Sequence, residues 1–266
     1  MTADEEARVA AGYDSVYDRL PQSETFRRIW REHASGIDFP EGFDHISFVT
    51  SAEIQRVADM LREGPHAMLV DLACGTGGPG LWLARELGAK LTGVDISDVA
   101  LDHARDRARQ LGLASIAEFS SGSFAATGLP PASADAAVSF DALQYAPDKR
   151  AALDEIARVL RPGGRLVFTC FEFAPERVTG LPVLGTDPVD DYAPLLANAS
   201  FDVTTYEETP GWNKRLTNAY SAVADARAAL IAELAEAGTN ALLGEITLTL
   251  QLKPYRRRVF ASAVRT

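Results

Sequence analysis

Two apolar periodicities alternate along the middle of the chain. Short apolar runs predict strands at residues 67–72, 90–95, 116–120, 134–140 and 165–171. Apolar residues spaced three or four apart predict helices at 78–87, 97–111 and 149–160, between those strands. A repeated strand, helix, strand order is typical of a parallel sheet with right-handed crossovers. The strands are apolar throughout, as expected where helices cover both faces of a sheet.

Helical spacing also precedes the first strand. Apolar residues from Val9 to Leu20 share one helical face, and Pro21 ends the pattern. A second helix is predicted from Ser51, as N-cap, to the stop signal at residues 64–65. We therefore predict an N-terminal helical arm or lid over residues 1–50 and one main α/β domain over residues 51–266.

The C-terminal part departs from simple alternation. A strand is predicted at residues 201–207, and the alternation of Val259, Ala261 and Ala263 predicts a closing strand. Residues 212–252 show helical spacing where a short turn would suffice, which indicates an inserted helical cap over the active-site face. The expected fold is α/β: a Rossmann-like, seven-stranded, mostly parallel sheet with helices on both faces, an N-terminal helical arm, and a helical cap before the last strand.

Composition narrows the classes of partner. The 26 Lys and Arg residues against 37 Asp and Glu residues give a net charge of -11, which repels nucleic acids and anionic membrane surfaces. The two cysteines make no disulfide framework, and the N-terminus shows no signal-peptide pattern. We expect a cytoplasmic protein, a monomer or homodimer, that binds neither nucleic acid nor membrane.

A glycine-rich turn follows the first predicted strand, at residues 70–80. Small residues in such a turn let the backbone approach a ligand, and the following helix offers oriented N–H groups. Asp95 ends the next strand, where a carboxylate can accept hydrogen bonds from a ribose. These features suit NAD or S-adenosylmethionine. Ala73 stands where the dinucleotide fingerprint has glycine, and Asp71 favours an ammonium group over a pyrophosphate.

Four segments, taken in order, carry a resemblance to a known family. Residues 70–80, 93–97, 140–148 and 160–166 resemble the motifs of class I S-adenosylmethionine-dependent methyltransferases, particularly the bacterial enzymes that modify small molecules and natural products. The resemblance covers residues 51–210 and the last strand. It implies binding of S-adenosylmethionine and release of S-adenosylhomocysteine.

The resemblance also implies roles for individual positions. The family normally has an acid for the adenine amino group where this chain has Ser123, so that contact would pass to the hydroxyl or to a nearby carbonyl, with Phe124 stacking on the base. The residues implied in cofactor binding are Tyr17, Asp71, Ala73, Gly75, Gly77, Asp95, Ile96, Ser123, Phe124, Phe140 and Gln144.

Candidates for chemistry and acceptor binding lie outside these motifs. Glu172 follows an apolar strand between two phenylalanines and is the first candidate for a general base, with His45 as a second catalytic candidate. Tyr13, Tyr145 and Trp212 are the acceptor-binding candidates. The four histidines lack metal-ligand spacing, so no metal is expected. Arg256 and Arg258 are interpreted as a solvated strand edge. If the acceptor carries a carboxylate or diphosphate, they become candidates for binding it, together with Arg257, Lys214 and Arg215.

The sequence thus favours an enzyme that moves a methyl group to O, N or C of a small, largely apolar metabolite. C-methylation of a prenyl-like chain, with Glu172 as base, is one specific version. The alternatives are an NAD-dependent oxidoreductase, and a cyclase or binder of the same fold that holds S-adenosylmethionine without methylating.

Overall fold

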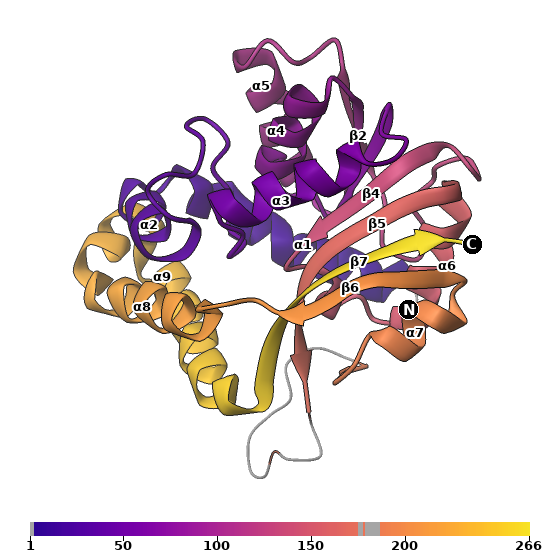
Figure 1. Ribbon diagram of the computed structural model, residues 1–266. Helices are drawn as coiled ribbons and strands as arrows, with labels where there is room; N and C mark the ends of the chain where they lie inside the picture. Colours follow the sequence, from indigo (N-terminus) through magenta and orange to yellow (C-terminus); the bar gives the residue numbers. More distant parts are fainter. Residues whose placement is uncertain (1–2, 175–177, 179–186) are drawn as a thin grey trace.

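A single sheet of seven strands organises the molecule (Figure 1), and the computed structural model describes residues 3–174, 178 and 187–266. The strand order is β3-β2-β1-β4-β5-β7-β6. Strand β7 runs antiparallel to both β5 and β6, and the other described pairs are parallel. The strands are β1 (Met68–Leu72), β2 (Lys90–Asp95), β3 (Ala117–Ser121), β4 (Ala134–Phe140), β5 (Leu160–Phe173), β6 (Phe201–Glu208) and β7 (Arg256–Arg265).

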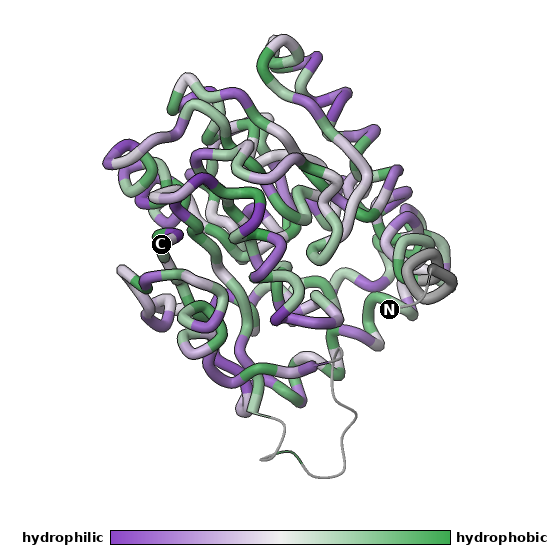
Figure 2. Tube along the Cα trace, turned by 90° about the vertical axis from the view of Figure 1, so that its right-hand side faces the viewer, coloured by the Kyte–Doolittle hydropathy of each residue, from purple (hydrophilic) through white to green (hydrophobic). Residues whose placement is uncertain are grey.

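Helices cover both faces of this sheet. On one face α3 (Ser51–Arg62), α4 (Gly78–Leu87) and α5 (Asp98–Gln110) pack into a continuous apolar core with the strands. On the other face α6 (Lys149–Val159) and α7 (Ala193–Asn198) form a second core. Purple and green alternate along the outer helices in Figure 2, as expected for helices with one face on the sheet and one in solvent.

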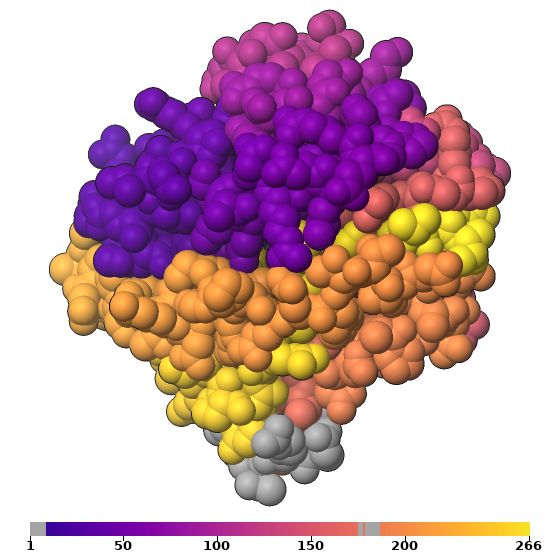
Figure 3. All heavy atoms as spheres, viewed as in Figure 1, coloured from indigo at the N-terminus to yellow at the C-terminus, as the bar shows by residue number. Residues whose placement is uncertain are grey.

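A third apolar cluster joins the two ends of the chain. Helix α2 (Glu24–Trp30) and the π turn after it (Arg31–Ser35) pack against α8 (Trp212–Asp225) and α9 (Arg227–Leu252). Phe48 of the N-terminal segment touches Trp30 and Phe171, with ring centroids 4.9 Å and 6.0 Å apart. Figure 3 shows the indigo N-terminal segment lying directly on the orange C-terminal helices. Residues separated by most of the sequence therefore build one body beside the sheet.

The predicted fold class is confirmed, and the differences are local. Helix α1 (Ala3–Arg19) ends just before Pro21, as predicted, but α2 was missed because it is only 7 residues long. The cap of α3 is Thr50 rather than Ser51: the Thr50 hydroxyl accepts from Glu53 N, and the Glu53 carboxylate accepts from Thr50 N. Residues 212–252 form two helices, with a left-handed backbone at Ala235 (φ 62°) inside the second.

Candidate active site

The turn between β1 and α4 lies at the carboxyl edge of the sheet. Ala73, Gly75 and Gly77 have positive φ angles of 56°, 52° and 77°. The turn is closed by hydrogen bonds from Cys74 N to Val94 O and from Gly77 N to Cys74 O. A left-handed alanine is unfavourable by about 1–2 kcal/mol, so the local structure holds Ala73 in this conformation against its own preference. Such turns expose backbone groups to a ligand.

Asp95 ties the end of β2 to this turn. Its Oδ2 accepts from Gly75 N at 2.8 Å, and its Oδ1 accepts from Ser97 N at 2.9 Å. The side chain is nearly inaccessible, and burial raises its pKa while these backbone donors oppose the shift. The carboxylate is therefore held rigidly at the end of β2, beside the glycine turn.

Asp71 is the second buried acid at this edge. Burial, reinforced by the nearby charge of Asp95, raises the pKa of Asp71 to about 8. Gly80 of α4 allows the close approach, because a Cβ there would lie 2.4 Å from Asp71 Oδ2. Two neighbouring acids that pair with no cation among the described residues suit a ligand that carries positive charge. S-adenosylmethionine has two such groups, an ammonium and a sulfonium.

Helix α1 covers the glycine turn. Tyr17 is 8% exposed, and its hydroxyl lies 2.7 Å from the position that a Cβ on Gly75 would take. Asp14, one turn earlier, accepts from the Ser97 hydroxyl at 2.6 Å and from Val99 N at 3.3 Å, at the start of α5. The N-terminal arm is thus anchored by hydrogen bonds over the ends of β1 and β2.

Between these elements lies a cavity of about 380 Å³, open solvent at its mouth included. Its walls come from the N-terminal segment, the glycine turn and the end of β4. The lining residues are Tyr17, His45, Ile46, Ser47, Asp71, Ala73, Cys74, Gly75, Thr76, Pro79 and Phe140. Six predicted site residues meet here: Tyr17, His45, Asp71, Ala73, Gly75 and Phe140.

His45 enters this cavity as a neutral imidazole. Burial lowers its pKa to about 3, and its ring packs edge-on against Phe39 at 4.3 Å. Nδ1 lies 2.9 Å from Ser47 Oγ, whereas Nε2 is buried without a hydrogen-bond partner in the described part of the chain. A buried ring nitrogen without a partner is unfavourable unless a ligand bonds to it.

The residues predicted to contact adenine lie outside that lining. Ile96 follows Asp95 directly, and Ser123 forms an antiparallel bridge with Ala126. Gly122 N donates to Asp95 O at 3.0 Å, which brings the 121–123 segment alongside Asp95. Phe124 is partly buried and packs against the second core. The structure therefore places this group at the β2 and β3 end of the site, next to the cavity.

Gln144 braces the ends of two strands. Its Nε2 donates to Asp141 O at 2.6 Å, and its Oε1 accepts from Phe171 N at 3.3 Å. Both ends of the amide are thus bonded to backbone. Of these two residues implied in cofactor binding, Phe140 lines the cavity and Gln144 supports the loop after it.

A buried charge network beneath the site was not predicted. Arg258 is fully buried and donates to both carboxylate oxygens of Asp141, at 2.8 and 3.1 Å, and to Glu53 at 2.7 Å. Asp141, with φ of 53°, also accepts from Phe48 N at 2.7 Å. The interpretation of Arg258 as a solvated strand edge is wrong, because β7 lies between β5 and β6 with both faces covered. The network holds the N-terminal segment against the end of β4.

Glu172, the predicted base, does not line the cavity beside the glycine turn. One oxygen accepts from the Tyr206 hydroxyl, and the other accepts from Arg257 Nε at 2.6 Å. The Tyr206 oxygen in turn accepts from Tyr192 N. The side chain is 2% exposed, so its lone pairs are directed at protein partners and away from solvent. These contacts favour a structural role.

The three acceptor-binding candidates differ in exposure. Tyr145 is 48% exposed, and its ring packs edge-on against Tyr13 at 6.4 Å, joining the loop after β4 to α1. Trp212 is 4% exposed, donates to Glu208 at 2.7 Å and packs against Phe171. The structure brings the two tyrosines together beside the site and uses Trp212 as a packing anchor.

The described residues contain neither a metal-binding cluster nor a membrane-spanning helix. No group of three or more His, Cys, Asp or Glu side chains among them is arranged to hold a metal ion. No helix among them is long and apolar enough to cross a membrane.

The strand order, the antiparallel β7 and the glycine turn flanked by two acids define the class I methyltransferase fold. Comparison with known proteins agrees, since residues 70–168 match the family described as methyltransferase domain. The 27-O-demethylrifamycin SV methyltransferase of Amycolatopsis mediterranei is 27% identical over 80% of this chain and 82% of its own length. The methyltransferase GfsG of Streptomyces halstedii is 31% identical, over 62% of this chain and 63% of its own length. Residues 70–168 are therefore similar to a methyltransferase domain, and most of the chain is similar to methyltransferases that are named for small-molecule natural products.

Solved structures show the same fold at low sequence identity. The [4+2]-cyclase SpnF is 22% identical with a TM-score of 0.72, over 98% of this chain and 96% of that one. The geranyl diphosphate C-methyltransferase of Streptomyces coelicolor A3(2) is 19% identical with a TM-score of 0.61, over 92% and 99%. At such identities the likeness concerns the fold alone.

Proposed function

We propose that this protein transfers a methyl group from S-adenosylmethionine to a small, largely apolar acceptor. The observation that carries the proposal is the cavity at the carboxyl edge of β1, walled by the glycine turn and backed by Asp71 and Asp95. Its test is isothermal titration with S-adenosylhomocysteine and with NADH. Binding of S-adenosylhomocysteine alone is expected, and binding of NADH alone would favour the oxidoreductase alternative.

The residues of the site fit the cofactor chemically. S-adenosylmethionine supplies a methyl group on a positively charged sulfur. Asp71 provides negative charge toward the ammonium group, and Asp95 provides an acceptor for the ribose hydroxyls. Tyr17 of α1 lies directly over Gly75 in the glycine turn. Orientation in a dry site can supply much of the acceleration for such a displacement.

The acceptor side is proposed to lie under the N-terminal arm (1–50) and the helical cap (212–252). Tyr145, half exposed and in contact with Tyr13, is the side chain best placed to touch an acceptor. The rifamycin relative bears the name of an O-methyltransferase, which supports a hydroxyl on a natural product as the methylated group. Product mass after incubation with hydroxylated macrocyclic compounds and with prenyl diphosphates tests the O- and C-methyl versions.

The need for a base depends on the acceptor. A hydroxyl or carbon that loses a proton calls for one, whereas an amine does not. The neutral His45 lines the cofactor cavity and is proposed to contact the cofactor rather than the acceptor proton. General-base catalysis by Glu172 stays a prediction, and the kcat of the Glu172→Gln variant tests it.

A second candidate function rests on the likeness to SpnF. A cyclase of this fold would bind S-adenosylmethionine and leave it unchanged while a polyene acceptor closes a ring. Transfer of label from methyl-labelled S-adenosylmethionine to an organic product supports methylation. A product of unchanged mass, formed with the cofactor fully recovered, would instead support the cyclase.

A further inference from the structure

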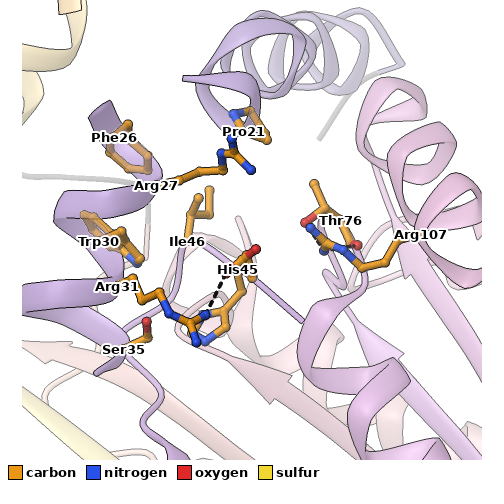
Figure 4. Close-up of a pocket in the computed structure, with 11 residues that line it drawn as sticks. Pro21, Phe26, Arg27, Trp30, Arg31, Ser35, His45, Ile46, Thr76 and Arg107 are labelled. Atoms are coloured by element: carbon orange, nitrogen blue, oxygen red, sulfur yellow. Dashed lines mark hydrogen bonds and ion pairs between the residues drawn. The ribbon is translucent and has the colours of Figure 1, made fainter. Parts of the chain in front are cut away.

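A second cavity, of about 430 Å³ with open solvent included, adjoins the cofactor cavity (Figure 4). It lies between α2, the segment at residues 44–46, the glycine turn and α5. The two cavities share His45, Ile46 and Thr76, so they meet at the proposed methionine end of the cofactor site. Its other lining residues are Pro21, Phe26, Arg27, Trp30, Arg31, Ser35, Asp44 and Arg107. We call it the arginine cavity.

Three guanidinium groups line the arginine cavity, and Asp44 is the one carboxylate in its lining. Arg31 is bonded to Asp44 at 3.3 Å and to the carbonyls of Ile37 and Phe39. Arg107 donates from Nη1 to Thr76 O and Oγ1, at 2.6 and 2.7 Å, so it is fastened to the glycine turn. In Figure 4 Arg27 and Arg107 reach toward the cavity from opposite sides.

Arg27 differs from the other two in its contacts. Arg27 is exposed, its guanidinium forms no hydrogen bond or ion pair within the described ranges, and its charge helps to lower the pKa of Glu233. The Glu233 carboxylate is itself occupied by Ser23 and Thr25. Burial lowers the pKa of Arg107, Asp44 opposes that shift, and the like charge of Arg27 adds to it. Positive charge thus exceeds negative charge around this space in a protein of net charge -11.

A second, independent feature points to a ligand here. His45, which belongs to both cavities, keeps its Nε2 buried and without a partner in the part of the chain that the structure describes. With Ser47 bonded at Nδ1, the ring can carry its hydrogen on Nε2, which then needs an acceptor that the described residues do not supply. Guanidinium groups and an N–H donor around one cavity are the groups that bind carboxylate and phosphate oxygens.

We propose that the arginine cavity binds an oxyanion, a carboxylate or phosphate group, beside the methionine end of the cofactor site, with Arg27 as its principal cation. Two sources have this chemistry. One is the carboxylate of the cofactor's own methionine, and this version rests on the proposed function. The other is an anionic group of a separate small molecule.

The first arm of the test compares two ligands in the Arg27→Gln variant. S-adenosylhomocysteine carries the carboxylate, and 5′-methylthioadenosine lacks the whole amino-acid part. If the cofactor is the source, the dissociation constant of S-adenosylhomocysteine rises by about 10- to 150-fold, as expected for one lost charged hydrogen bond, and that of 5′-methylthioadenosine stays unchanged. Arg28→Gln is the matched control, because Arg28 is the next residue on α2 and pairs with Glu32 outside the cavity.

The second arm uses inorganic phosphate without cofactor, with sodium chloride at equal ionic strength as reference. If a separate anion is the source, phosphate stabilises the wild type and Arg28→Gln against thermal unfolding, and Arg27→Gln loses that shift. The proposal is overturned if Arg27→Gln matches the wild type in both arms. A wild type that binds no S-adenosylhomocysteine would refute the proposed function instead, since the phosphate arm needs no cofactor.

Discussion

Two regions of this molecule differ in how the positive charge of their arginines is balanced. Around Arg258, two carboxylates and the Thr209 hydroxyl accept hydrogen bonds from a fully buried guanidinium, so each charge has an opposite charge in contact. Around Arg27, three guanidiniums share one lining carboxylate, and the space remains open. In the first region the arginine is paired with carboxylates, whereas in the second the guanidinium groups outnumber the one lining carboxylate.

The difference separates a charge that holds the fold from a charge available to a ligand. Removing one member of a buried, fully paired group leaves the others desolvated and unpaired. Removing a cation from an open, positively charged cavity leaves no buried partner behind. Substitutions in the first region should therefore change stability, and substitutions at the second and at the cofactor acids should change binding.

The largest effect is expected for Arg258→Met. This change leaves Asp141 without a cation and leaves Glu53 with Arg215 alone, so the free energy of unfolding should fall by about 3–5 kcal/mol. Urea denaturation measures it. Arg150→Met, which removes a cation from an exposed pair with Asp154, should change stability by less than about 1 kcal/mol. Equal stabilities of the two variants would refute the view that the Arg258 network holds the fold.

Asp95→Ala should weaken binding and also lower stability, because Gly75 N and Ser97 N lose their acceptor. Loss of one charged hydrogen bond to the ribose is worth about 1.5–3 kcal/mol, which raises the dissociation constant of S-adenosylhomocysteine about 10- to 150-fold. Isothermal titration measures the change, and Asp98→Ala, in the exposed first turn of α5, is the control. Unchanged affinity in Asp95→Ala would remove Asp95 from the site.

Glu172→Gln distinguishes a structural acid from a base. If the carboxylate serves only to bond Arg257 and Tyr206, the amide should reduce stability by about 1–2 kcal/mol and leave kcat nearly unchanged. A general base would instead show a fall in kcat of about 100-fold or more. Steady-state kinetics below the melting temperature, alongside urea denaturation, separates these outcomes.

The smallest effect concerns protons at Asp71. In the folded protein the pKa of this carboxyl is about 8, against an ordinary pKa of 3.8. The stability that the protonated carboxyl contributes is therefore lost as pH rises from 3.8 to about 8. A bound ammonium group favours the carboxylate, so cofactor binding near pH 7 should release up to one proton. Titration calorimetry in buffers of different ionisation enthalpy measures this release, which Asp71→Asn should abolish.

Local patterns were sufficient for much of the fold. Helix α4 and strands β2 and β4 begin and end at the residues predicted, because apolar periodicity and the flanking glycines and prolines act within a few residues of each element. Asp71, Ala73 and Gly75, which were predicted for one site, line the same cavity, since a turn between consecutive elements keeps its residues together.

Long-range pairing escaped the same reasoning. Alternation along β7 suggested solvent around Arg258, but β7 is an interior strand, and partners from residues 53 and 141 meet the guanidinium there. Glu172 was chosen for its position after an apolar strand, and its partners Tyr206 and Arg257 come from neighbouring strands. Neither pairing has a signal within its own stretch of sequence.

The amino-acid sequence alone determined the class of fold, the place of the glycine turn and the two acids beside it, because these depend on short-range periodicity and backbone preference. Only the tertiary structure decided which charged side chains are paired and which face open space. That outcome depends on desolvation and on contacts between residues far apart in the chain, and these exist only once the sheet and its covering helices have assembled.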